Sequence, residues 1–145
     1  MMNSDLALFR DALRSSAYRE SVSFVDYSNS RCWAEPFLWG PGPNLSADGD
    51  PEMEVEDQPD RATWSMYSNV AFQGRTIGFL VMTGNKYLAI EASSAPLAHR
   101  NEARRAWLAH HRMELLVIDV EALKANPDQV VSNFFELAHS PVRRA

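Results

Sequence analysis

The sequence is poor in residues that cross-link a small fold. Its single cysteine, Cys32, cannot form a disulfide within the chain, and a lone cysteine is most often a small buried apolar residue. Neither a Cys-x-x-Cys pair nor a His-Glu-x-x-His motif occurs, so the common zinc-site patterns are absent. Packing must therefore stabilise the fold, and we expect the protein to reside in a reducing compartment, the cytoplasm.

Long apolar runs are lacking as well. The longest of them, over 77–82 and 115–118, fall far below the roughly 20 residues that a membrane helix needs. The first five residues are not basic and precede no apolar run, so we expect no secretory leader. A length of 145 residues, with 46% hydrophobic and 23% charged residues, is typical of one soluble domain, which we place over 1–145.

Positive charge is also in short supply, because the net charge is −5. This balance disfavours tight, sequence-independent binding to nucleic acid, whose affinity comes from neutralised phosphates. The segment 44–60 lacks Lys and Arg altogether and carries seven acids: Asp48, Asp50, Glu52, Glu54, Glu56, Asp57 and Asp60. We predict that it is an acidic mobile insertion loop, with a polyanionic arm that imitates nucleic acid as the alternative.

Hydrophobic periodicity places the regular elements of the remaining chain. Leu6, Phe9 and Leu13 recur at helical spacing, whereas Ile77, Phe79 and Val81 alternate and are expected to share one face of a strand. In chain order the predicted elements are a helix over 5–19, strands over 22–27, 64–72, 76–82 and 87–92, a helix over 96–112, a strand over 113–120 and a helix from 127. This order predicts a mixed α/β fold, a small sheet flanked by helices, with parallel strands over 87–92 and 113–120.

Short motifs in the second half of the chain follow one another in a characteristic order. They are Ile77-Gly78-Phe79, Leu88-Ala89-Ile90-Glu91-Ala92-Ser93, His99, Asn101-Glu102-Ala103-Arg104-Arg105, Leu115-Leu116-Val117-Ile118 and Asn126-Pro127-Asp128. The series resembles the very-short-patch-repair-like branch of the PD-(D/E)XK nucleases. The resemblance implies a restriction-endonuclease-like fold in the order α-βββ-α-β-α.

The resemblance also assigns candidate site residues. Nucleases of this kind hold a divalent cation, usually Mg²⁺, between acids on neighbouring strands, and the metal activates water. Glu91 matches the second acid and is the candidate catalytic and metal-binding residue, but the first acid is replaced by Gly78, a third ligand by Ser93 and the helix acid by Asn101. One carboxylate holds Mg²⁺ poorly, so we expect no cofactor, or Mg²⁺ only if the site is active.

A basic helix follows Glu91 in the sequence. His99, Arg100, Arg104 and Arg105 are the candidate residues for binding nucleic acid or a protein partner, with a solvated helix face as the plain alternative. We expect Glu91 to lie beside this helix. The resulting hypothesis is a binding or adaptor module on a catalytically impaired nuclease-like scaffold, without a membrane or a small-molecule cofactor.

Two other functions stay open at this point. The first is an active metal-dependent endonuclease with a displaced acid, for which Asp60 and Asp119 are the nearest alternatives in the sequence. The second is an acidic regulator that uses residues 48–60 to imitate nucleic acid.

Overall fold

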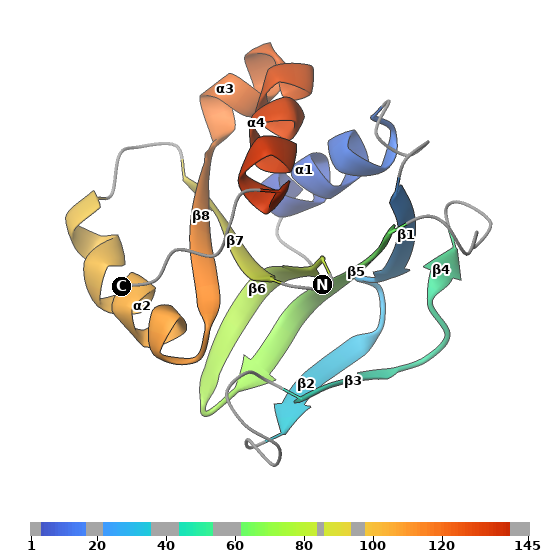
Figure 1. Ribbon diagram of the computed structural model, residues 1–145, viewed down its shortest axis with the longest axis vertical. Helices are drawn as coiled ribbons and strands as arrows, with labels where there is room; N and C mark the ends of the chain where they lie inside the picture. Colours follow the sequence, from blue (N-terminus) through green and yellow to red (C-terminus); the bar gives the residue numbers. More distant parts are fainter. Residues whose placement is uncertain are drawn as a thin grey trace.

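The computed structural model of the chain describes residues 4–16, 22–35, 44–53, 62–83, 86–93 and 98–139. These residues form four helices and eight strands (Figure 1). The helices are α1 (Ser4–Arg14), α2 (Ala98–His110), α3 (Val120–Ala125) and α4 (Pro127–His139). The strands are β1 (Val22–Tyr27), β2 (Arg31–Glu35), β3 (Asn44–Asp48), β4 (Glu52–Met53), β5 (Ala62–Phe72), β6 (Arg75–Met82), β7 (Tyr87–Ser93) and β8 (Met113–Asp119).

All eight strands belong to one mixed sheet, whose main order is β3-β2-β5-β6-β7-β8. Strands β5, β6 and β7 form an antiparallel meander, and β8 returns parallel to β7 after α2. The predicted mixed α/β class and the parallel pairing of these last two strands are therefore confirmed. None of the helices in the described ranges is long and apolar enough to span a membrane.

The long strand β5 carries two strands along one of its edges. β1 runs parallel to its first half, and β2 pairs with its second half at Trp33 and Ala71. β3 and β4 lie antiparallel to β2 and β1 respectively. The prediction of an irregular loop over 44–60 is thus wrong for 44–48 and 52–53, because pairing with β2 and β1 overrides the acidic composition. Residues 54–60 lie outside the described residues.

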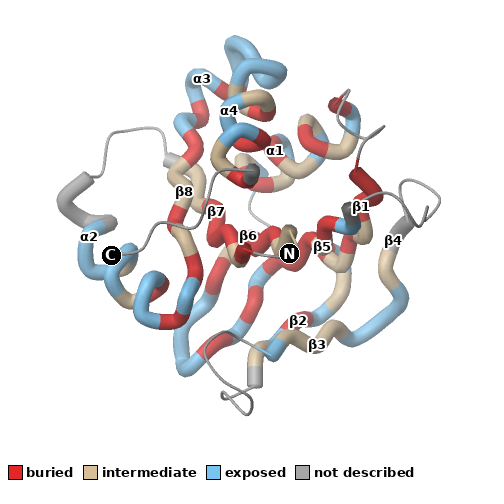
Figure 2. The backbone as a smooth tube through the Cα atoms, in the orientation of Figure 1, coloured by how far each residue is buried: buried red, intermediate tan, exposed pale blue. Residues whose placement is uncertain are grey.

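Helices cover both faces of the sheet. α1, α3 and α4 gather on one face, where Phe9 meets Phe79 and Phe134 edge to face at 6.3 and 5.3 Å (Figure 1). α2 lies apart on the other face, where Leu108 joins a second buried cluster with Leu80 and Ala89. Figure 2 shows the buried positions concentrated in β5, β6 and β7, between these two layers.

Local sequence signals explain the helix ends. The side chain of Asp119 accepts a hydrogen bond from the backbone N–H of Glu121 and caps α3, a short helix that the periodicity did not predict. The side chain of Asn126 accepts one from Gln129 N–H at 3.3 Å, and Pro127 occupies the first helical position of α4. The predicted start of the last helix is confirmed.

The sheet is kinked where β5 passes β6. Ser68 pairs with Phe79 and Val70 with Ile77, but no pair joins Asn69 to Gly78 between them, and Asn69 has a positive φ of 49°. Phe79 packs with the α1 cluster, whereas Ile77 and Val70 pack with the α2 cluster. The prediction that Ile77, Phe79 and Val81 share a face is therefore wrong for Ile77, because side-chain alternation shifts at the kink.

Candidate functional site

Glu91 lies near the end of β7, in a regular part of the sheet. It pairs with Val117 of β8, and one residue earlier Ile90 pairs with Phe79 of β6. The pairing of β6 with β7 ends at this pair, so Gly78 and Glu91 each lie one residue beyond it. The two positions that the family resemblance assigns to metal-binding acids are therefore next to the last paired residues of the two strands.

Arg104 of α2 binds the Glu91 carboxylate directly through its Nε. The same guanidinium donates from Nη2 to the backbone oxygen of Thr76 at 2.9 Å, so it joins β7 to β6. Both side chains are half-buried, with 25% of Arg104 and 27% of Glu91 exposed. The structure thus brings together two of the candidate residues, and the ion pair engages the carboxylate that a metal would need.

Gly78 faces the opposite layer. A Cβ added at this position would come within 2.8 Å of Leu6 Cδ1, on α1. Contacts this close force neighbouring atoms to move. Since Glu91 reaches α2 while position 78 points to α1, a carboxylate at 78 would displace the Leu6 side chain and lie on the opposite side of the sheet from Glu91.

No further acid completes a metal site within the described ranges. No group of three His, Cys, Asp or Glu side chains is close enough there to hold a metal ion. The carboxylate of Asp119 caps α3. The side chains of Ser93 and Asn101 lie outside the described residues, as does Asp60. The described residues therefore do not fit the Mg²⁺ that the family resemblance implies.

The basic side of α2 is partly described. Arg105 is exposed and donates from Nη1 to the backbone oxygen of Leu115 at 2.9 Å. His99 and Arg100 belong to α2, but their side chains lie outside the described residues. Arg112 follows the helix in a turn with φ 59°, so it does not continue the face of α2.

Trp107 of α2 was not predicted to be a site residue from the sequence, but two arginines contact its ring. The Arg75 guanidinium lies over the Trp107 ring at 4.6 Å, and that of Arg104 lies 5.9 Å from the same ring. In the sequence, Trp107 is one of the apolar positions of the predicted helix, and Arg75 belongs to the strand β6. Only the tertiary fold brings them together, so no local motif could have identified the pair.

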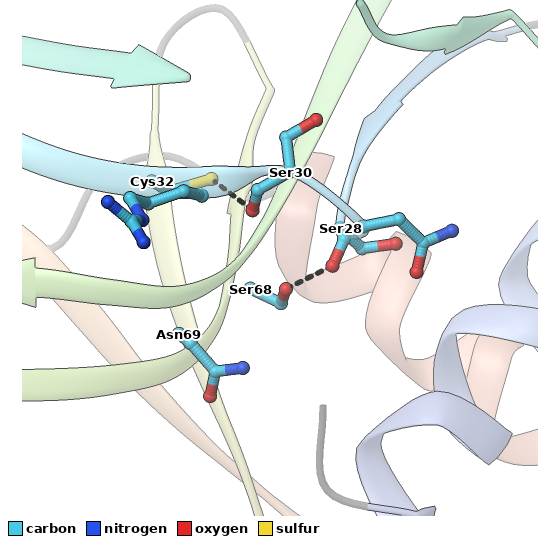
Figure 3. Close-up of a pocket in the computed structure, with 7 residues that line it drawn as sticks. Ser28, Ser30, Cys32, Ser68 and Asn69 are labelled. Carbon is cyan, nitrogen blue, oxygen red and sulfur yellow. Dashed lines mark hydrogen bonds between the residues drawn. The ribbon is translucent and has the colours of Figure 1, made fainter. Parts of the chain in front are cut away.

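A second site lies on the other side of the molecule, beside the kink. A pocket of about 400 Å³ opens between the turn 28–30, the start of β2, and Ser68 and Asn69 of β5 (Figure 3). Cys32 is buried in its wall, and burial raises the pKa of the thiol, which disfavours the nucleophilic thiolate. The prediction that Cys32 is a buried apolar residue is confirmed.

Comparisons of the chain with protein-family models, with curated proteins and with solved structures gave no match.

Proposed function

We propose that the protein is a non-catalytic binding module on a nuclease-like scaffold, and that the basic side of α2 holds the phosphates of a nucleic acid. The restriction-endonuclease-like scaffold is part of the proposal, supported by the order of β6, β7, α2 and β8 and by the motifs along them. The surface concerned comprises Arg75, Arg104, Arg105 and Trp107, and is called the α2 surface below.

The ion pair between Glu91 and Arg104 is the observation that carries the non-catalytic part. A carboxylate binds Mg²⁺ through its oxygen lone pairs, and a guanidinium that donates to the same group competes for them. A second acid would have to come from across the sheet, where Leu6 occupies the space beside Gly78. The carboxylate therefore serves to position Arg104 on the α2 surface rather than to hold a cation.

The α2 surface has the composition of a phosphate-binding site. Arginine binds phosphate with a planar set of donors, and an aromatic ring beneath it restricts its orientations. Arg75 and Arg105 are exposed, while Trp107 is half-buried between Arg75 and Arg104. Charged groups held in place by packing bind with a smaller loss of conformational entropy.

The test is fluorescence polarisation with labelled single- and double-stranded DNA in a series of salt concentrations. We expect binding that weakens with salt, and substitution of Arg75→Gln or Arg105→Gln should each lower the salt slope by about 1. Lys124→Gln, which removes one exposed charge from α3, is the matched control and should leave binding unchanged. Equal binding by all four proteins would contradict the proposal.

Cleavage is measured in parallel with Mg²⁺ and Mn²⁺. We expect no product from the wild type at any metal concentration. Cleavage by the wild type that disappears in Glu91→Gln would overturn the non-catalytic assignment and favour an active endonuclease.

The net charge of −5 favours a second candidate, an acidic protein segment bound by the same α2 surface. A globally negative chain repels long nucleic acid polymers more than a short acidic peptide. Titration with poly-glutamate separates the two candidates. If the surface binds acidic protein segments, poly-glutamate should displace labelled DNA at equal charge concentration; if it binds nucleic acid, it should not.

A further inference from the structure

The pocket beside the kink exists because the sheet loses its pairing there. β1 and β5 pair in parallel up to Tyr27 and Tyr67, and β2 and β5 pair again only at Trp33 and Ala71. Five residues, 28–32, therefore face three, 68–70. The chain between β1 and β2 bulges away from β5, and the pocket lies in the gap. Irregularities of this kind often adjoin functional sites, because they redirect side chains out of the ladder.

Polar side chains replace the missing ladder bonds and gather at the gap. The hydroxyl of Ser68 donates to the backbone oxygen of Ser28, and the thiol of Cys32 donates to the backbone oxygen of Ser30 at 3.5 Å (Figure 3). Hydroxyl, amide and guanidinium groups contribute to the pocket lining, from Ser28, Ser30, Arg31 and Asn69 among others, and apolar atoms supply a comparable share of its surface. Its volume of about 400 Å³ is within the range of small-molecule sites.

A buried ionic network holds the pocket wall from behind. Asp26 is almost fully buried, accepts a hydrogen bond from Arg14 at 2.8 Å and accepts another from the backbone N–H of Ser28 at 2.7 Å. Arg10 donates to the hydroxyl oxygen of Ser28, also at 2.8 Å. Because that oxygen accepts from a guanidinium, the hydroxyl is free to donate its own proton elsewhere. The network thus holds the Ser28 hydroxyl in place at the pocket wall.

The charged group of the lining favours an anion. No carboxylate lines the pocket, whereas Arg31 does, and this exposed guanidinium makes no ion pair with any described residue. Asn69 also lines it, with a positive φ of 49° that asparagine adopts more readily than most residues other than glycine.

We propose that this pocket is a binding site for a small ligand that carries a phosphate group. The guanidinium of Arg31 supplies the positive charge, and the hydroxyls of Ser28 and Ser30 and the amide of Asn69 supply neutral donors from the turn and from β5. A phosphate has oxygens in four directions and suits donors that come from two separate segments. The site is independent of the α2 surface and is expected to bind whether or not that surface binds nucleic acid.

The test uses inorganic phosphate as the probe, followed by amide chemical shifts of the full-length ¹⁵N-labelled protein at constant ionic strength. We expect saturable shifts at 28–32 and 68–70, with a dissociation constant on the order of 1 mM for so small an ion. Arg31→Gln should weaken binding about tenfold, the effect of losing one charged hydrogen bond. Arg112→Gln removes an exposed arginine after α2 and is the matched control, with unchanged binding expected.

Two further measurements separate the proposal from simple charge effects. Asn69→Gly removes the amide and relieves the positive φ, so it should weaken phosphate binding while the melting temperature is unchanged or higher. Acetate, titrated in the same way, should shift the same amides at least about tenfold more weakly, because it offers only two oxygens on one side. Shifts that do not saturate, that are equal in wild type and Arg31→Gln, or that acetate reproduces at equal concentration would overturn the assignment.

Discussion

Two carboxylate–arginine pairs join helices to this sheet, and they differ chiefly in burial. Glu91 and Arg104 bind each other at the α2 surface, where each side chain keeps about a quarter of its area exposed. Asp26 and Arg14 bind at 2.8 Å beneath α1, and the Asp26 side chain has no exposed area. Glu91 lies in the regular pairing of β7 with β8, whereas Asp26 lies one residue before the pairing of β1 with β5 ends. We therefore expect the Glu91–Arg104 ion pair to position a side chain on the α2 surface, and the buried Asp26–Arg14 ion pair to stabilise the fold.

Of the substitutions considered, we expect one at Asp26 to reduce the stability of the fold most. Asp26→Ala removes the carboxylate that binds Arg14 and leaves the buried backbone N–H of Ser28 without its acceptor, so it should cost about 3 kcal/mol of unfolding free energy. Urea denaturation measures this loss. Asp11→Ala is the matched control, because the Asp11 side chain pairs with Arg10 in an exposed position and should change stability by less than about 0.5 kcal/mol. Equal effects of the two substitutions would show that burial does not separate these regions.

A second large effect is expected at Gly78, which lies at the kink in β6. Gly78→Ala places a methyl group 2.8 Å from Leu6 Cδ1, and overpacking of this kind costs about 2 kcal/mol. Thermal and urea denaturation of the variant measure the loss.

A double-mutant cycle tests the cause. In a Leu6→Ala background the clash is absent, so Gly78→Ala should cost at least about 1 kcal/mol less than in the wild type. A coupling energy near zero would mean that Gly78 matters for its backbone and not for the approach of α1.

The contrast between the regions also explains which features the sequence could predict. Glu91 was identified through the family resemblance and Arg104 through the charge of its helix, and the predicted crossover unit brings that strand and that helix together. The mixed sheet and the parallel pairing of β7 with β8 follow from local patterns. Gly78 was identified as a missing acid, but its contact with Leu6 depends on how α1 crosses the sheet.

The kinked region depends on pairing between distant segments, which local patterns do not encode. Ser28 and Ser68 are 40 residues apart, and nothing in either segment indicates the other. β3 and β4 lie in an acidic stretch of low strand propensity, and their partners β2 and β1 decide their conformation. Asn69 is an ordinary strand position by its neighbours, so the shift in alternation becomes visible only in the fold.

A smaller effect, and one that depends on pH, is expected at His111 beneath the α2 surface. Its ring lies edge-on to Phe72 at 4.9 Å and near Trp107 and His110, and burial, followed by repulsion from His110, lowers its pKa from 6.5. The unfolded chain then binds a proton more readily than the folded protein. The unfolding free energy should therefore fall as the pH drops below about 6.5 and level off once the pH is below the folded-state pKa.

The measurement is urea denaturation between pH 7.5 and pH 5, on wild type and on His111→Phe, which keeps an aromatic ring against Phe72 and Trp107. The difference in stability between the two proteins should change in the variant's favour as the pH falls. A difference that is constant across the range would show that His111 is not held neutral.

The smallest effect is expected at Glu91, and it separates the positioning role from a structural one. Glu91→Gln keeps the shape of the side chain and removes the charge from a partly exposed ion pair, so stability should change by less than about 1 kcal/mol, and less still at high salt. Polarisation with labelled DNA should nevertheless respond, because Arg104 loses the partner that fixes it while the net charge becomes more positive. If positioning matters, binding weakens despite the added positive charge; if only charge matters, binding strengthens. A loss of stability as large as that of Asp26→Ala would instead mean that the two ion pairs are equivalent, and the division of the molecule into a regular and a kinked region would have no energetic basis.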